Sequence, residues 1–491
     1  MLMFFTGLLI LLFGYIFYGA FVEKVIGISE RRATPAITDS DGVDYVIMRR
    51  WKNMMIQLLN IAGVGPVLGV IMGIKFGAIV FLIIPIGNII GGAVHDFVAG
   101  MMSLRSHGAN LPTLIRKENG KVFAAIFTVF MTILLLLVVA VFITTPAMLC
   151  ASLAPAAKSP VLWTAVAAIF LYYIASTIFP VDKIIGRIYP LFGALLLIGT
   201  ALLFVKLMLA ADADPALLKE SVAFRKRMWM AADNKPIIPL LFVTIACGIL
   251  SGFHATQAPI IARTMRSERE ARCDFYGMMV VEGFIAMVWA AAGLAIYNIF
   301  PEKMGDKAPE VLKYLCTYFL GSWAGALVVV SVIILSITSG DTAMRSLRLS
   351  LAEILHIPQK KLWTRVLLCL PVIVIVAILI WWSTDPNNKK SFDQLWNYFA
   401  WGNQVLAACT LTVATEWLIA RKRNAVITII PGAFMTFIVI CYILWISEKH
   451  GGPVGFGLDL HVAEIIAGVL AGICTGLSVW RGFRTQKRLT H

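Results

Sequence analysis

Long apolar runs separated by short polar segments dominate the chain. The run FAAIFTVFMTILLLLVVAVFI, residues 123–143, is about as long as the ~20 residues with which a helix crosses ~30 Å of hydrocarbon. Runs of this kind predict about thirteen membrane-spanning helices. They lie near residues 1–22, 54–73, 77–104, 122–146, 161–178, 188–209, 237–262, 276–299, 318–349, 365–382, 396–418, 425–446 and 461–480. The first lacks a basic leader and a small-residue cleavage site, so we expect it to be kept as a span.

Two of the predicted spans contain residues that interrupt a regular helix. The second includes NIAGVGPVLG at 60–69, and the seventh includes SGFHATQAP at 251–259. Within a bilayer, irregular backbone persists only where it is buried in protein or lines a wet cavity. The two breaks lie five spans apart, and an odd offset gives the two units opposite orientations. The pattern predicts an inverted repeat whose first helices are discontinuous and bind substrate; two unrelated kinks are the alternative.

This interpretation predicts an all-α polytopic membrane protein with a five-plus-five inverted repeat, one extra helix before it and two after it. The expected parts are an N-terminal helix with a cytoplasmic loop (1–53), a first repeat (54–209), an extracytoplasmic loop (210–236), a second repeat (237–418), and C-terminal helices with a basic tail (419–491). We expect the last two helices to pack on the scaffold or to form a homodimer contact.

Composition agrees with this class, since 59% of the 491 residues are hydrophobic and only 14% are charged. The net charge of +15 could indicate nucleic acid as a partner. However, assigning the loops alternately to two sides places most lysines and arginines on one side. The positive-inside rule then puts the N-terminus outside and the tail RGFRTQKR in the cytoplasm. The basic residues are thus a topology signal, with contact to anionic lipid as a secondary use.

Polar residues at the breaks are the candidate substrate ligands. His254 is ionisable and could take up a proton or hold a substrate carboxylate; a neutral histidine bonded to a freed carbonyl is the alternative. Glycines let backbone approach a ligand, and the positive end of a half-helix suits a carboxylate. The candidates, which include two residues of the eleventh span, are Asn60, Gly63, Gly65, Pro66, Ser251, Gly252, His254, Thr256, Gln257, Asn403 and Gln404.

Eight stretches between residues 31 and 404 carry a family resemblance. In order they are RRATPAITDSDGVDY, IAGVGPVLG, GGAVHDF, SLRSHGANL, SGFHATQ, FYGMMVVEG, ITSGDTAMRS and LWNYFAWGNQ. With these motifs the chain resembles the carbon starvation protein A family of bacterial inner-membrane transporters. The resemblance implies the leucine-transporter-like inverted repeat of the amino acid–polyamine–organocation superfamily. It also implies uptake of a small carbon source during starvation, either a peptide or pyruvate with protons.

Two features depart from the longer members of that family. They carry a histidine pair shortly before the first break, where this chain has MMIQLLN, and often glutamine where this chain has His95. Pyruvate and peptides both present a carboxylate, so the half-helix argument does not choose between them. The substrate therefore stays open at this point.

Further polar residues are candidates for coupling transport to an ion. In this superfamily the ninth span meets the first broken helix at the cation site of sodium-coupled members. That span contains Thr338 and Ser339, whose hydroxyl groups suit sodium, and Asp341, which can bind sodium or carry a proton. Asp341 is the first choice for coupling, and a salt bridge to Arg345 on the same helix face is the structural alternative.

Three more ionisable residues lie within predicted spans. His95 and Asp96 follow two glycines in the third span, where Asp96 could carry a proton or pair with a nearby arginine. We favour a structural or gating pair. Glu282 in the eighth span is expected to pair with one of the arginines of the preceding loop, 263–272.

Known enzyme and pump motifs are absent from the sequence. It contains no GxxxxGK[ST], HExxH or GxSxG, and its eight cysteines form no CxxC pair. We therefore expect no enzyme activity, cofactor or metal. The leading hypothesis is a proton-coupled importer of a small carboxylate, with peptide uptake or sodium coupling as alternatives and an uncoupled channel or starvation sensor as a remote one.

Overall fold

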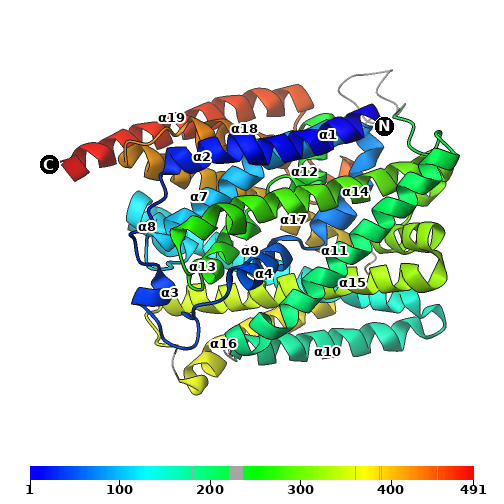
Figure 1. Ribbon diagram of the computed structural model, residues 1–491, viewed down its shortest axis with the longest axis horizontal. Helices are drawn as coiled ribbons and strands as arrows, with labels where there is room; N and C mark the ends of the chain where they lie inside the picture. The colour runs from blue at the N-terminus through cyan, green and yellow to red at the C-terminus, as the bar shows by residue number, and fades with distance from the viewer. Residues whose placement is uncertain are drawn as a thin grey trace.

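The computed structural model describes residues 1–178, 181–220, 236–359, 361–385, 388, 390–450 and 452–490, and every regular element in them is helical (Figure 1). The α-helices are α1 (Leu2–Phe13), α2 (Gly19–Ile26), α3 (Pro35–Thr38), α4 (Arg50–Ile61), α5 (Val70–Gly73), α6 (Val80–Gly87), α7 (Ala93–Leu104), α8 (Leu111–Asn119), α9 (Lys121–Leu153), α10 (Lys158–Ile178), α11 (Val181–Ala213), α12 (Ile237–Thr244), α13 (Phe253–Ala262), α14 (Met278–Ile299), α15 (Ala308–Ile354), α16 (Leu362–Ser383), α17 (Ser391–Ala420), α18 (Val426–Trp445) and α19 (Leu460–Thr490). Short helical turns used below are η2 (Gly65–Gly69), η6 (Ala246–Gly248) and η9 (Pro301–Gly305).

The membrane spans of the structure agree closely with those that the sequence predicts. In the described residues, ten helical stretches are long and apolar enough to cross a bilayer, and there are twelve spans if each of two bent pairs counts as one. These match twelve of the predicted spans. The other one, 396–418, is α17, a helix of 30 residues whose polar side chains, Asn403 and Gln404 among them, lower its hydropathy. The chain is a multi-pass membrane protein.

Both predicted breaks bend the chain. Arg50–Ile61 and Gly65–Phe76 meet at 57°, and Ile237–Thr244 and Ala246–Ala262 meet at 66°. The second break begins earlier than the motif suggested, because the backbone is irregular from Ile245 to Gly252 and regular again from Phe253. His254 therefore lies in the first turn of the half-helix that follows the break.

Glycines bring the two breaks into contact with their neighbours. A Cβ atom on Gly65 would lie 2.1 Å from Cβ of Cys247, so only glycine lets η2 pack against η6. A Cβ atom on Gly252 would lie 2.3 Å from the backbone nitrogen of Ala407 in α17. These two glycines thus allow close approach between neighbouring segments.

The remaining helices surround the broken pair. α9 packs along α15, and α10, α11 and α16 pack against these two; α1 lies against α6 and α14. The two C-terminal helices α18 and α19 pack on α17 and on each other, which agrees with the expected scaffold role. The chain termini lie at opposite ends of the molecule (Figure 1).

Candidate substrate and coupling site

An imidazole between two carboxylates lies at the centre of the molecule. Nδ1 of His254 is 3.0 Å from Oδ2 of Asp96, and its Nε2 is 3.9 Å from Oε2 of Glu282. The three side chains are at most 1% exposed. His95 joins the group through Nδ1, which lies 2.9 Å from Oδ1 of Asp96. We call His95, Asp96, His254 and Glu282 the central acidic group.

The central acidic group combines both predicted repeats. Asp96 lies on α7 and Glu282 on α14, the second helices of the first and second repeat, whereas His254 belongs to the second broken helix. The backbone carbonyl of Ile61, at the end of the first broken half-helix, also interacts with the His254 ring. One side chain thus contacts three other helical segments, α4, α7 and α14, so a change in its protonation affects all of them.

Two expected ion-pair partners differ from those in the structure. Asp96 contacts two histidines rather than an arginine, and Glu282 faces His254 rather than the arginines of the loop at 263–272. Of those arginines, Arg263 pairs with Glu353, Arg269 with Glu30 and Arg272 with Glu23. These three arginines pair with carboxylates of α15, of the segment after α2 and of α2, whereas Glu282 faces the buried histidine. A signal for this existed in the sequence, since Asp96 and Glu282 are acidic residues in corresponding helices of the repeat.

Asn403 stabilises the backbone of the second break through hydrogen bonds. Its Oδ1 accepts a hydrogen bond from the backbone N–H of Phe253 at 2.6 Å, and its Nδ2 donates to Oγ of Ser251 at 2.8 Å. Its backbone carbonyl accepts from the N–H of Gly252 at 3.2 Å. The N–H groups of Gly252 and Phe253, at the start of α13, are therefore bound by α17. Asn403 caps this half-helix in place of a ligand.

Other buried amide groups have no hydrogen-bond partner among the described residues. Both side-chain polar atoms of Asn60 and of Gln404 lack such a partner, and so does Oε1 of Gln257. Gln57, one turn before Asn60 on α4, belongs with them. An unsatisfied buried polar group costs about 1–3 kcal/mol, so these amides are strong candidates for contact with a bound polar molecule.

The remaining predicted ligands contact other residues of the chain. Oγ1 of Thr256 donates to the carbonyl of Phe253 at 2.7 Å and accepts from Nε2 of Gln257 at 2.9 Å. Gly63 packs against Phe142, and the Cβ position of Gly63 is 3.5 Å from Oγ of Ser339. Pro66 lies within η2 and is buried.

The ninth predicted span meets the first break, as expected. Oγ of Ser339 donates to the carbonyl of Leu59 at 2.9 Å, and Oγ1 of Thr338 donates to the carbonyl of Leu335 at 2.8 Å. Asp341 is fully buried and accepts a hydrogen bond from the hydroxyl group of Tyr172 at 3.3 Å. Hydroxyl, carbonyl and carboxylate oxygens thus gather along this part of α15.

A cavity of about 300 Å³ opens beside the second half of the first broken helix. By the predicted topology it lies on the outer side. Leu68 and Met72 of the broken helix, Thr145 of α9 and the start of α17 line it, together with η9 and the residues after it. It contains charged groups, Asp306, Lys307 and Asp393. This cavity therefore presents polar and charged groups beside the first break.

Comparison with models of protein families shows to which family the chain belongs. The family model described as carbon starvation protein CstA matches residues 1–232, 164–313 and 308–441. The chain belongs to this family. The resemblance in its motifs is thereby confirmed.

Similar proteins include named transporters. An uncharacterized membrane protein of Haemophilus influenzae is 41% identical over 350 residues, 62% of this chain and 94% of that protein. The pyruvate/proton symporter BtsT of Escherichia coli is 28% identical over 370 residues, 61% of this chain and 51% of BtsT. The peptide transporter CstA of Campylobacter jejuni is 27% identical over 353 residues, 57% of this chain and 48% of that protein. The matched parts thus span about half the length of the two named transporters.

Solved structures with a similar fold are also transporters. A variant of the Eremococcus coleocola manganese transporter superposes with a TM-score of 0.58 at 15% identity and covers 91% of this chain and 99% of its own. MhsT in complex with L-phenylalanine gives 0.58 at 13% identity, covering 88% and 99%. At such identities the likeness shows the fold alone. These neighbours have the leucine-transporter fold, so the predicted fold class is confirmed.

Proposed function

We propose that this chain is a secondary active transporter of the bacterial inner membrane that imports a small carboxylate nutrient, such as pyruvate, together with protons. The observation that carries the proposal is the position of His254, buried between Asp96 and Glu282 at the junction of the two broken helices. The similarity to a pyruvate/proton symporter supports the same choice of substrate and ion.

The net negative charge of the central acidic group favours proton binding. Two bare carboxylates and a neutral imidazole would carry two negative charges in a buried site, where unpaired charge is strongly unfavourable. One proton on His254 leaves a single negative charge, and a second proton on Glu282 makes the group neutral. The wider gap of 3.9 Å to His254 makes Glu282 the carboxylate that loads this second proton.

The same balance couples the proton to an anionic substrate. A carboxylate arriving near a group with net negative charge is repelled, and protonation of Glu282 removes that repulsion. Substrate and proton therefore favour each other's binding, which is the requirement for symport. Asn60, Gln257 and Gln404 supply unsatisfied amides for the substrate. We place proton coupling here rather than at Asp341, because two carboxylates face one imidazole.

Two alternatives have specific support. Relatives named peptide transporters favour a peptide, whose C-terminal carboxylate has the same charge as pyruvate. The oxygens of Ser339, Thr338 and Asp341 near the first break favour sodium as the coupling ion. In the first case the central acidic group keeps its role, whereas in the second it would be structural.

Uptake of labelled pyruvate into proteoliposomes tests the proposal, with a proton gradient and a sodium gradient imposed separately. One pH unit corresponds to about 1.4 kcal/mol, so one-to-one symport under that gradient sustains about tenfold accumulation. We expect accumulation with the proton gradient alone. Accumulation only with sodium would move coupling to α15, and none in either gradient would exclude pyruvate and make di- and tripeptides the next substrates to assay.

A further inference from the structure

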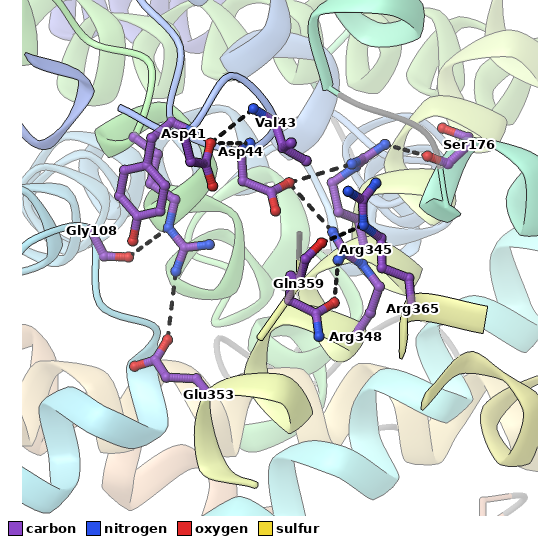
Figure 2. Close-up of polar contacts among 12 residues, drawn as sticks. Asp41, Val43, Asp44, Gly108, Ser176, Arg345, Arg348, Glu353, Gln359 and Arg365 are labelled. Atoms are coloured by element: carbon purple, nitrogen blue, oxygen red, sulfur yellow. Dashed lines mark hydrogen bonds and ion pairs between the residues drawn. The ribbon is translucent and has the colours of Figure 1, made fainter. Parts of the chain in front are cut away.

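A buried carboxylate, Asp44, lies among arginine side chains on the predicted cytoplasmic side of the molecule (Figure 2). Of residues 39–49, between α3 and α4, only Asp44 and Met48 are buried. Oδ1 of Asp44 lies 3.4 Å from Nη2 of Arg348 and 3.8 Å from Nη1 of Arg345. Both arginines lie on α15 and are at most 1% exposed. The loop thus inserts one negative charge between two buried guanidinium groups.

Both arginines are also held by groups other than Asp44. Nη1 of Arg348 donates to Oε1 of Gln359 at 2.5 Å, and Arg345 donates to the backbone carbonyl of Ser176. The backbone carbonyl of Gln359 in turn accepts from Nε of Arg365 at 2.6 Å, as Figure 2 shows. These contacts would keep the guanidinium groups in place if Asp44 left. The pair is therefore a preformed anion site.

Asp44 fills this site as a charged group. Burial alone would raise the pKa of Asp44, but the guanidinium groups of Arg348 and Arg345 hold it below its ordinary value. The turn that presents it is built from within the loop, since Oδ1 of Asp41 accepts from the N–H groups of Val43, Asp44 and Tyr45 at 2.8–2.9 Å. Such a turn can leave the arginines as a unit.

The arginine pair lies next to the contacts between α15 and both broken helices. Ser339 bonds the first of them at Leu59, and Ser346 donates to the carbonyl of Thr256 in the second. Arg345 and Arg348 lie on the same helix, on either side of Ser346 and nearer its predicted cytoplasmic end than Ser339. The two arginines are three positions apart and share one face of α15, whereas Ser339 and Ser346, seven apart, share another. On the predicted topology the pair therefore lies about two turns of α15 nearer the cytoplasm than the contact at the first break.

We propose that Arg345 and Arg348 form a release site for the carboxylate group of the transported molecule, and that Asp44 occupies this site until the substrate carboxylate displaces it. The proposal rests on the proposed function only in taking the substrate to be a carboxylate. Asp44 is then an internal competitor whose departure opens the cytoplasmic side.

Pyruvate binding to the purified full-length chain tests this competition, with the dipeptide alanyl-alanine as second probe and uncharged pyruvamide as ligand control. Removal of a competitor raises apparent affinity by the inverse of the fraction of sites that it left unoccupied. We expect Asp44→Asn to bind at least one of the two carboxylates about tenfold more tightly or better, and the added change Arg348→Gln to abolish the gain. Asp39→Asn is the matched control, because Asp39 is exposed in the same loop and contacts His107 instead.

Two further readouts complement the binding assay, and the first of them needs no variant. In the unaltered chain the N–H of Met48 donates to the carbonyl of Thr264 at 3.1 Å, so displacement of the loop by pyruvate or the dipeptide should speed its hydrogen exchange. Cys369 is buried on α16, near enough to both arginines to interact with their charges. It should react faster with a small thiol reagent in Asp44→Asn. Mass spectrometry of the peptide that contains Cys369 measures this rate.

The proposal is wrong if Asp44→Asn tightens neither carboxylate, if the gain survives Arg348→Gln, or if pyruvamide gains equally. These results are separable from the transport assay. Accumulation of pyruvate without a change in Asp44→Asn would retain the proposed function and overturn the release site. If the chain accumulates no pyruvate but Asp44→Asn binds a carboxylate more tightly, the release site is retained and the proposed function is overturned.

Discussion

Nδ1 of His254 lies 3.0 Å from Oδ2 of Asp96, and this contact joins the second broken helix to the second helix of the first repeat. The two residues are 158 positions apart in the chain. Since Glu282 approaches the same ring from the second repeat, His254 is the point at which both repeats share a charge. In a fold whose repeats move relative to each other, protonation at this point biases the movement.

The first prediction concerns the His254–Asp96 contact. Asp96→Asn and His254→Gln should each lower proton-driven uptake by about tenfold or more, because removing one member of a buried ion pair typically costs about 3–5 kcal/mol. The double variant should lose much less than the sum of the two single losses. Initial uptake rates in proteoliposomes at equal protein content measure this. Additive losses would show that the two side chains act independently.

The second prediction separates coupling from binding at Glu282. Glu282→Gln keeps the size of the side chain and removes its proton-accepting carboxylate. We expect loss of accumulation under a pH gradient, while exchange of external for internal labelled substrate persists. Glu310→Gln, which alters a half-exposed carboxylate paired with Lys158, serves as control and should leave both activities intact. Accumulation by Glu282→Gln at the unaltered rate would exclude Glu282 as the proton carrier.

The third prediction concerns the cap on the second break. Asn403→Ala removes the acceptor for the buried N–H of Phe253, and an unsatisfied donor costs about 1–3 kcal/mol. We expect a lower melting temperature in detergent and slow uptake. Asn397→Ala, on the same helix but only partly buried, should melt close to the unaltered protein. Equal melting of the two variants would contradict a capping role.

The fourth prediction distinguishes a coupling site on α15 from one at the central acidic group. Ser339→Ala removes the hydroxyl group that donates to Leu59, a neutral hydrogen bond worth about 1 kcal/mol. Under proton coupling, this variant and Asp341→Asn should still accumulate substrate in a pH gradient. A loss of pH-driven accumulation in Asp341→Asn, with His254→Gln still active, would instead place the coupling site on α15.

The fifth prediction follows from the lowered pKa of Asp44. A carboxyl group whose pKa is lower in the folded chain contributes stability above its ordinary value of 3.8, and this contribution is lost as pH falls through the lowered value. We expect the hydrogen-exchange protection of the Met48 amide to fall below about pH 4. Asp44→Asn should lack this acid step, because its side chain does not titrate. The same step in both proteins would assign it to another carboxyl group.

The sequence by itself determined the membrane class, the positions of the spans and the location of both breaks. Hydropathy acts over about twenty neighbouring residues, and glycine and proline act on their own backbone, so each of these features is local in the chain. The offset between the breaks then predicted the inverted repeat. Asn60 and Gln404, which the sequence predicts as ligand-binding groups, are buried amides without a hydrogen-bond partner among the described residues.

Only the tertiary structure decided which polar groups meet. Glu282 faces His254 rather than an arginine, Asn403 caps a half-helix rather than lining a cavity, and Asp44 reaches α15 from a loop that hydropathy leaves unassigned. Each pairing joins residues on different helices, and the depth and rotation of a helix are set by packing against its neighbours. A single sequence shows that a buried charge needs a partner, but packing selects the partner.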